Sequence, residues 1–245
     1  MTGDAVSLVV GGLVAVAEAA LVVFVVVKVV RVIRRVRALP GRTLLVDALE
    51  DALGHELPRR LGAVLATETS AVVYALGGWR RPTPKAGFST HRERSYLVII
   101  GVLSFLVAVE TAGLHLVLLL HVSTTVAWVA TALSVYALLW LVGDAQATRL
   151  HPILVDEHGV SLAQGIRWRT EVPFALLEAA VAIDTAPAGA LKMGNLGANV
   201  LLRLREPVSV RGAFGMRRRT DRIALTVDGR ERFLAEVERR RSSAS

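Results

Sequence analysis

The stretch "YLVIIGVLSFLVAVETAGLHLVLLLHVSTTVAWVATALSVYALLWL", residues 96–141, is apolar along nearly its whole length. An α-helix needs about 20 apolar residues to cross a bilayer, so about 45 residues are enough for two crossings. The short segment "HVS" at residues 121–123 divides the stretch. The stretch therefore predicts a membrane-spanning helical hairpin, with spans at about residues 96–120 and 124–141.

The composition of the whole chain supports a membrane protein. Apolar residues make up 53% of the 245 residues and the mean hydropathy is +0.50, whereas soluble domains are about 45–50% apolar. The formal net charge of +8 favours anionic partners. Lipid head groups are preferred over nucleic acid, because no aromatic platform for bases accompanies the basic runs. The absence of cysteine excludes disulfides and thiolate metal sites.

A further apolar run lies at residues 6–30 and ends in the basic sequence "KVVRVIRRVR". It is longer than the roughly 7–15 apolar residues of a secretory signal, and it therefore predicts a third, uncleaved span. Lys and Arg are dense in the loop at residues 31–95 and absent from the N-terminal segment and from the 121–123 turn. This asymmetry predicts a multi-pass membrane protein with its N-terminus outside and its C-terminal part in the cytoplasm.

The loop between the first two spans is expected to be helical. Within residues 43–56, "TLLVDALEDAL" has apolar residues at helical spacing, and the pattern resumes after Pro58 over residues 59–77. Because basic residues flank both segments, they predict two amphipathic helices on the inner leaflet. Glu68 falls on the apolar side of the second helix, which is unusual.

The part of the chain after the third span, residues 146–241, has a different pattern. About seven short runs between Ile153 and Val227 predict strands, with "NVLLRLR" and "PVSVRG" among them as separate strands. The sequence "DGRERFLAEVERRR" predicts a closing helix capped by Asp228. Seven strands and a terminal helix are typical of a pleckstrin-homology (PH)-like β domain. Residues 242–245 are expected to form a disordered tail.

Three stretches carry a resemblance to a known family: "FSTHRER" at residues 88–94, "GDAQATRLHPILVDEHGVSL" at 143–162 and "PVSVRGAFGMRRRTDRIALTVD" at 207–228. They resemble an uncharacterised, mostly actinobacterial family of integral membrane proteins with a C-terminal bacterial PH-like domain. The resemblance implies a bacterial cell-membrane protein whose β domain is cytoplasmic. It implies no reaction, so no catalytic residue is carried over.

Two glutamates lie near the midpoints of predicted spans, Glu18 in the first and Glu110 in the second. An acidic side chain at the bilayer centre costs about 2.5–3.5 kcal/mol on insertion scales. The two carboxyl groups are therefore expected to face each other or a polar partner, with one proton shared or both acids neutral, and Thr131 of the third span is expected close by. His115 belongs to the same intramembrane polar set, although it lies about 140° around the helix from Glu110.

This polar set supports three interpretations, and in the least favoured of them Glu and His side chains bind a metal in an intramembrane enzyme. In the first, the carboxyl pair only hydrogen-bonds the spans together. In the second, Glu18 and Glu110 handle a proton or cation in an ion-coupled transport component, which would need oligomerisation because three spans are few for a transporter. No metal and no cofactor are expected, since neither H-E-x-x-H nor E-x-x-H spacing occurs.

Basic residues crowd the C-terminal domain, and those expected to contact lipid or a partner lie in or near the "MRRRTDR" run: Arg211, Arg217, Arg218, Arg219 and Arg222. Arginine forks suit phosphate groups, and an arginine near an anionic leaflet contributes about 1 kcal/mol of attraction. We therefore expect a non-enzymatic scaffold or sensor. Its β domain is expected to bind anionic lipid of the inner leaflet or a protein partner, and that partner could be a second copy of the chain. The alternative is that these arginines only reflect the positive-inside bias. No catalytic residue is predicted, because the sequence has no Walker loop, G-x-S-x-G or dinucleotide motif.

Three further residues lie at the inner boundaries of the predicted spans. Asp144 is expected to end the third span and to pair with an arginine such as Arg149. His91 and His151 lie at the inner ends of different spans, which would bring them to the same membrane boundary.

Overall fold

The computed structural model describes residues 44–92, 95–194 and 197–244. The chain forms two compact units that divide between Ala66 and Thr67. The predicted first span, residues 6–30, lies outside the described residues.

In the first unit, helix α2 (Leu45–Gly54) is followed by the first part of α3 (Arg59–Gly77). Pro58 stands directly before α3, where a helix needs no N–H donor. Gly62 allows the two helices to approach closely, because a Cβ there would lie 3.3 Å from the Gly54 nitrogen. The buried residues of α2 lie on one side of the helix and are Val46, Ala48, Leu49 and Ala52.

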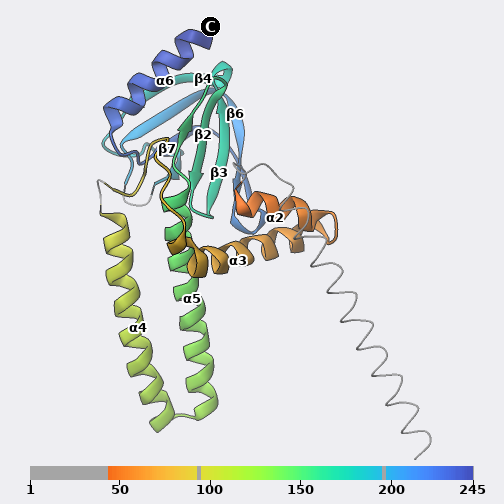
Figure 1. Ribbon diagram of the computed structural model, residues 1–245, viewed down its shortest axis with the longest axis vertical. Coiled ribbons are helices and arrows are strands. Elements are labelled where there is room, and N and C mark those ends of the chain that lie inside the picture. The colour runs from red at the N-terminus through yellow and green to blue at the C-terminus, as the bar shows by residue number, and fades with distance from the viewer. Residues whose placement is uncertain (1–43, 93–94, 195–196, 245) are drawn as a thin grey trace, which may run out of the picture. The chain divides into compact units, whose positions relative to one another are not determined.

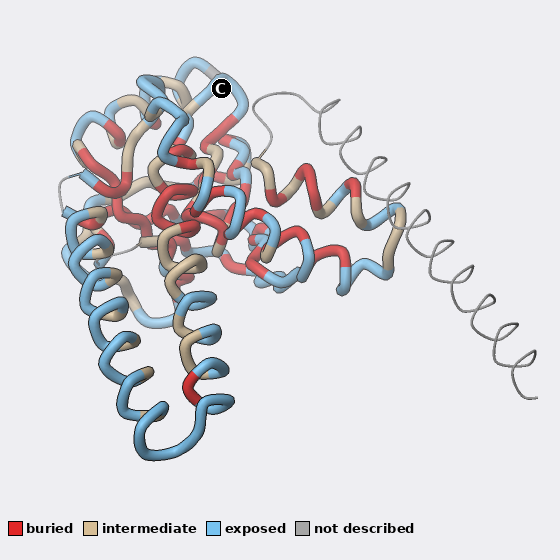
Figure 2. The backbone as a smooth tube through the Cα atoms, turned by 60° about the horizontal axis from the view of Figure 1, so that its bottom comes forward, coloured by how far each residue is buried: buried red, intermediate tan, exposed pale blue. Residues whose placement is uncertain are grey.

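Helices α4 (Tyr96–His121) and α5 (Thr124–Leu150) form the predicted hairpin (Figure 1). Ser123 caps α5 by accepting a hydrogen bond from the Val126 N–H at 3.2 Å. The outward surface of the hairpin is exposed over most of its length (Figure 2) and consists largely of apolar side chains. Three described helices are long and apolar enough to cross a membrane, at Arg59–Arg80, Tyr96–His121 and Thr124–Leu150. The first of them contains α3, for which the sequence predicts a position on the leaflet.

Helix α5 extends beyond the predicted span, which ends near residue 141. It continues without interruption to Leu150, and its residues from Gly143 to Thr148 are buried. Gly143 lies against the backbone of α3, because a Cβ there would collide with the Ala71 carbonyl oxygen. Helix α5 therefore has an exposed apolar segment followed by a buried end that packs within the second unit.

The sheet domain has seven strands in the order β1-β2-β3-β6-β7-β5, with β4 paired to β6. All pairs are antiparallel except β5 with β7. The strands are β1 (Leu154–Val155), β2 (Gly159–Gln164), β3 (Trp168–Pro173), β4 (Leu177–Ala182), β5 (Leu191–Met193), β6 (Val200–Gly212) and β7 (Arg217–Leu225).

Strand β6 corrects the prediction of two separate strands in this region. It is one strand of 13 residues, with an irregular register against β7 between Arg203 and Val208. Pro207 lies in this irregular part, where its missing N–H costs no ladder hydrogen bond. The first half of β6 pairs with β4 and the second half with β3. This bent strand therefore connects the two halves of the sheet.

Helix α6 (Arg230–Ala244) covers the core of the sheet domain. Phe233 and Val237 are fully buried, in one cluster with Leu202 and Ile223 of the sheet. Phe88, from the segment before α4, packs edge-on against Phe233 with 5.2 Å between ring centroids. Burial of each such side chain stabilises the fold by about 1.5–3 kcal/mol.

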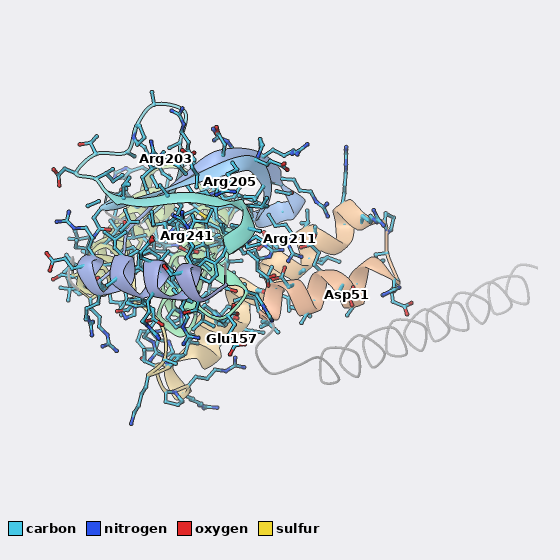
Figure 3. All side chains as sticks on the ribbon, turned by 90° about the horizontal axis from the view of Figure 1, so that it is seen from above. Asp51, Glu157, Arg203, Arg205, Arg211 and Arg241 are labelled. Atoms are coloured by element: carbon cyan, nitrogen blue, oxygen red, sulfur yellow. The ribbon has the colours of Figure 1, made fainter. Side chains whose placement is uncertain are left out.

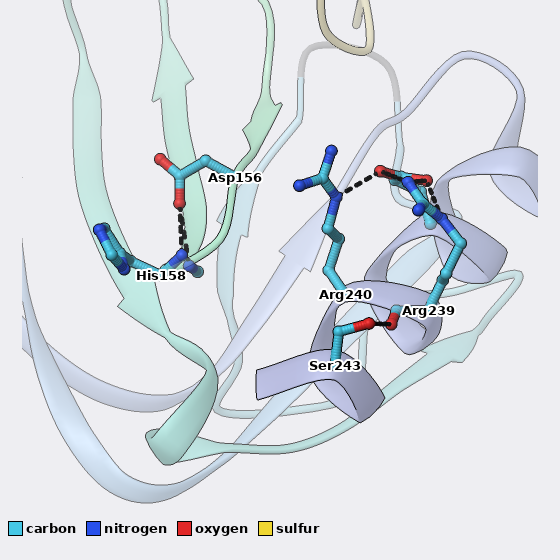
Figure 4. A network of polar contacts seen from close by, with 7 residues as sticks. Asp156, His158, Arg239, Arg240 and Ser243 are labelled. Atoms are coloured by element: carbon cyan, nitrogen blue, oxygen red, sulfur yellow. Dashed lines mark hydrogen bonds and ion pairs between the residues drawn. The ribbon is translucent and has the colours of Figure 1, made fainter. Parts of the chain in front are cut away.

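Side-chain hydrogen bonds stabilise the β1–β2 turn and helix α6 of the sheet domain (Figure 4). The Asp156 carboxylate accepts hydrogen bonds from the N–H groups of His158 at 2.9 Å and Gly159 at 3.1 Å, which closes the turn between β1 and β2. In α6, hydrogen bonds from Arg239 and Arg240 hold the pKa of the Glu236 carboxyl below its usual value.

The architecture confirms a helical region followed by a sheet of seven strands and a terminal helix. One boundary differs from the prediction, since α6 includes residues 242–244 of the expected tail. Here the hydroxyls of Ser242 and Ser243 donate to the carbonyl oxygens of Glu238 and Arg239, one helical turn earlier.

The close approach at Gly143 yields a stability prediction. Gly143→Ala places a methyl group against the α3 backbone and is expected to destabilise the protein by about 1–3 kcal/mol, as overpacking does. Gly101→Ala is the matched control, because a Cβ at Gly101 meets nothing within 4 Å. Thermal unfolding in detergent measures both variants. Equal melting temperatures for the two would contradict the packing argument.

Candidate functional site

The turn between β6 and β7 presents apolar side chains at the surface. It contains a short 3₁₀ segment, η3 (Ala213–Gly215), in which Phe214 has a φ of 57° and Gly215 a φ of 75°. A positive φ is rare for a phenylalanine, so neighbouring contacts must hold this conformation. Phe214 is 41% exposed and Met216 is 51% exposed.

Contacts with helices α3 and α5 hold this turn. The Phe214 N–H donates to the Thr67 hydroxyl of α3 at 2.9 Å. The Phe214 ring lies on the Trp140 ring of α5, with 5.5 Å between centroids and an interplanar angle of 31°. The turn is therefore fixed to both helices by one hydrogen bond and one aromatic contact.

Glu68 of α3 is hydrogen-bonded to the same tryptophan, Trp140. Its carboxylate accepts hydrogen bonds from the Tyr136 hydroxyl at 2.6 Å and from the Trp140 indole N–H at 3.3 Å. These partners explain why an acidic residue occupies the apolar side of a helix. We call Glu68, Tyr136, Trp140 and Phe214 the aromatic junction. Sequence reasoning noted Glu68 as unusual, but its two partners lie on α5 about 70 residues away, which local periodicity does not encode.

Four of the five predicted arginines lie next to this turn. In the register of β6 and β7, Arg211 lies opposite Arg217, Val210 opposite Arg218 and Ser209 opposite Arg219. Arg222 is separated from them, because it lies opposite Arg203 on the other side of the irregular register. All five are exposed, and Figure 3 shows Arg203, Arg205 and Arg211 spread along β6.

Within the hairpin, the structure brings His115 and Thr131 together. The distance from His115 Nδ1 to Thr131 Oγ1 is 2.8 Å, and the Thr131 hydroxyl donates to the Ala127 carbonyl oxygen at 2.9 Å. Since a hydroxyl has one hydrogen, Nδ1 of His115 is the donor in the first bond. The imidazole also meets the Trp128 ring edge-on at 5.0 Å. Thr131 is thus a partner of His115 and not of Glu110.

Glu110 lies on a different side of α4. The side chain is exposed, and among the described residues no hydrogen bond or ion pair reaches it. Its expected partner Glu18 lies outside the described residues, so the Glu18–Glu110 pair stays a prediction. The positions of α4 that are half-buried along the hairpin are Leu97, Ile100, Ser104, Val107, Thr111, His115 and Leu118.

Asp144 connects α5 to the turn between β2 and β3. Its carboxylate lies 2.9 Å from Arg167 Nε and accepts a hydrogen bond from the Ile166 N–H at 3.0 Å. Gly165, with a φ of 55°, has no Cβ that would collide with this carboxylate. Asp144 therefore pairs with an arginine, as the sequence predicts, but the partner is Arg167 and not the expected Arg149. Arg149 instead donates to Gln146, Thr83 and the carbonyl oxygens of Gly78 and Arg81.

The segment before α4 is bonded to the sheet domain as well. Phe88 and Ile153 exchange two backbone hydrogen bonds of 2.8 and 2.9 Å. The Asp228 carboxylate accepts the N–H groups of His91 at 3.1 Å and Arg92 at 2.8 Å, and the Asp228 N–H donates to the Ser89 carbonyl oxygen. Asp228 therefore binds this segment, and its predicted role as the cap of α6 stays a prediction.

The two boundary histidines have separate surroundings. His151 Nε2 lies 2.7 Å from the Tyr74 hydroxyl, whereas His91 is buried and its Nδ1 has no hydrogen-bond partner among the described residues. Burial lowers the pKa of His91, the Asp228 carboxylate opposes this shift, and Arg92 and Arg149 add to it.

In the part of the chain that the structure describes, no group of three or more His, Asp or Glu side chains is placed to hold a metal ion. No family model, curated protein or solved structure matches the chain. Functional inference therefore rests on the residues themselves, above all on the β6–β7 turn and the aromatic junction.

The lowered pKa of His91 predicts a pH-dependent stability. In the unfolded chain the imidazole takes up a proton near its ordinary pKa of 6.5, whereas the folded state resists protonation. The unfolded state then binds more protons, so stability falls as the pH drops below about 6.5 and is fully present above it. Melting temperatures at about pH 7.5 and about pH 5.5 measure this loss.

His91→Gln removes the titrating group and is expected to reduce the difference between the two melting temperatures. His158→Gln, at an exposed turn position, serves as the control and keeps the full difference. The prediction fails if His91→Gln retains the same pH dependence as the native chain.

Proposed function

We propose that the protein is a multi-pass bacterial membrane protein whose cytoplasmic, PH-like β domain binds anionic lipid head groups of the inner leaflet through the β6–β7 turn. In this proposal the protein acts as a non-enzymatic scaffold or sensor. The observation that carries it is the contact between Phe214 of the turn and Trp140 of α5.

Trp140 indicates the depth at which the β6–β7 turn would meet the membrane. It lies at the inner end of the predicted third span, and tryptophan rings favour the boundary between hydrocarbon and head groups. A ring in contact with Trp140 lies at a similar depth, so Phe214 would lie at that boundary. The exposed Met216 follows two residues later, which gives the turn two apolar side chains for the interface.

The neighbouring arginines have the charge and shape for phosphate. Arg217, Arg218 and Arg219 follow Met216 directly and are exposed. A guanidinium group forms paired hydrogen bonds with phosphate oxygens, and it retains its charge at any physiological pH. Apolar side chains at the tip with cations beside them match the layers of a leaflet, where hydrocarbon lies beneath charged head groups.

The aromatic junction provides a route for sensing. Trp140 contacts Phe214 on one side and donates to Glu68 of α3 on the other. A lipid that shifts the β6–β7 turn would therefore change contacts of α3 and α5 together. This arrangement supports a sensor more than a passive anchor.

Short-chain phosphatidylglycerol, titrated onto the full chain in detergent and followed by tryptophan fluorescence, tests the proposal. Replacing Arg217, Arg218 and Arg219 together with Gln is expected to weaken binding by about 3 kcal/mol, on the order of 100-fold, if each arginine contributes about 1 kcal/mol. Short-chain phosphatidylcholine is expected to bind weakly to both forms, since it offers no net negative charge.

The matched control replaces Arg203, Arg205 and Arg222 with Gln. It removes the same charge from β6 and β7, at positions away from the β6–β7 turn: Arg203 pairs with Arg222, and Arg205 lies in the irregular stretch between Arg203 and Val208. Phosphatidylglycerol affinity is expected to stay within about threefold of the native value, because more distant charges are screened. Equal losses in both triple variants would show a general charge effect and overturn the assignment to the turn.

A further inference from the structure

The segment directly before α4, residues 88–92, is bound to the sheet domain through its backbone, and we call it the α4 anchor. Phe88 exchanges two hydrogen bonds with Ile153, and the Ser89 carbonyl oxygen accepts the Asp228 N–H at 2.8 Å. The Asp228 carboxylate accepts the N–H groups of the last two anchor residues. Hydrogen bonds depend on distance and angle, so a displaced anchor residue would weaken several of them at once.

His91 is the buried titratable residue of the anchor. It is 6% exposed, and among the described residues its Nδ1 has no hydrogen-bond partner. A neutral imidazole has one nitrogen without a proton, whereas the charged ring carries a proton on both nitrogens. The buried Nδ1 therefore suits the neutral ring, because in the charged ring it would be a donor without an acceptor. The His91 carbonyl oxygen accepts the Tyr96 N–H at 3.2 Å, which connects this residue to the first turn of α4.

The charged groups around His91 also disfavour a positive ring. Arg92 follows it in the chain, and Arg149 of α5 adds a second positive charge. Arg149 is held in place by hydrogen bonds to its own surroundings. Among the described residues, Asp228 is the only negative charge that acts on His91, and its Oδ2 already accepts two backbone N–H groups. A proton on His91 would therefore place a third cation beside one carboxylate.

We propose that the α4 anchor is a pH-sensitive switch, in which a proton taken up by His91 from solution releases the segment from the sheet domain. The proton adds to Nδ1, and no other bond of the ring changes. A charged group is costly to bury, so the charged ring moves into water and the bonds to Ile153 and Asp228 are lost. The first turn of α4 is then free of the sheet, whereas Asp144 keeps α5 bonded to the β2–β3 turn. The switch does not depend on lipid binding by the β6–β7 turn.

Hydrogen–deuterium exchange of the full chain in detergent tests this release. Protection of the anchor amides is measured at about pH 7.5 and about pH 5.5 and is corrected for the intrinsic exchange rate at each pH. Burial lowers the pKa of His91 in the bound anchor, so the released anchor binds the proton more readily and opening increases as the pH falls. With an ordinary pKa of 6.5 in the released segment, one proton raises the open fraction by up to about tenfold over this interval.

A local release predicts that the anchor loses protection of about tenfold while β6 stays more protected than the anchor at both pH values. Equal protection of the anchor and β6 at about pH 5.5 would show that the anchor opens only when the whole domain unfolds, and this would overturn the proposal. Unchanged protection of the anchor between the two pH values would overturn it as well. Both readings come from the native chain and require no variant to fold.

Variants assign the response to the imidazole. His91→Gln takes up no proton and is expected to keep the protection of the anchor constant between the two pH values. His91→Arg is charged at both and is expected to show low protection at both. His158→Gln, at an exposed turn position, is the matched control and keeps the native response. A native response in His91→Gln would contradict the proposal.

The acidic residue nearest to His91 in the chain is Glu93, which lies outside the described residues. Glu93→Gln removes its charge and is expected to leave the tenfold change in place. A response that disappears in Glu93→Gln but persists in His91→Gln would assign the switch to that carboxylate and overturn the proposal. Replacing Arg217, Arg218 and Arg219 with Gln is expected to leave the response intact, which separates this switch from lipid binding.

Discussion

The second unit of this chain depends on the contacts of the buried Asp144 carboxylate with the β2–β3 turn. Asp144 lies on α5 just past the predicted span and holds the β2–β3 turn through Ile166 and Arg167. Removing a charged group from water is costly unless a partner of opposite charge and hydrogen bonds compensate it, and both are present here. Gly165 is required at this point, because any side chain there would occupy the place of the carboxylate. The position of α5 against the sheet follows from this contact.

The local sequence pattern was sufficient to predict most helices and strands. It was not sufficient to predict which residues contact one another across the fold. Hydropathy predicted the hairpin because bilayer thickness dictates helix length, and alternation predicted strands because side chains on a strand alternate between faces. The sequence predicted β6 as two strands, and it offered Arg149 as an example where the partner of Asp144 is Arg167. Asp228 binds a segment about 137 residues away, and no local pattern encodes such a partner. β6 looked like two strands because Glu206 and Pro207 interrupt the alternation, whereas the chain accommodates them in an irregular register.

In the candidate site, too, some residues were predictable from the sequence but their contacts were not. Its arginines were predictable, because a basic run in a strand-joining turn is visible in the sequence. The aromatic junction was not, since Phe214, Trp140 and Glu68 are brought together only by the fold. Of the polar residues that the sequence grouped in the predicted spans, only His115 and Thr131 are in contact among the described residues. Helical spacing separated His115 from Glu110, and packing then joined His115 to Thr131.

The hydrogen bonds at both ends of the hairpin have a mechanical consequence. The segment before α4 is bonded to Ile153 and Asp228, and the end of α5 to the β2–β3 turn. Helix α4 has 26 residues and is about 39 Å long at 1.5 Å per residue, longer than a hydrocarbon core of about 30 Å. In the proposed membrane placement, such a helix tilts to fit. With both helices fastened to the sheet, a thinner or thicker bilayer would rotate the whole β domain relative to the membrane plane. The hairpin would then act as a lever that converts bilayer thickness into the angle at which the β6–β7 turn meets the head groups.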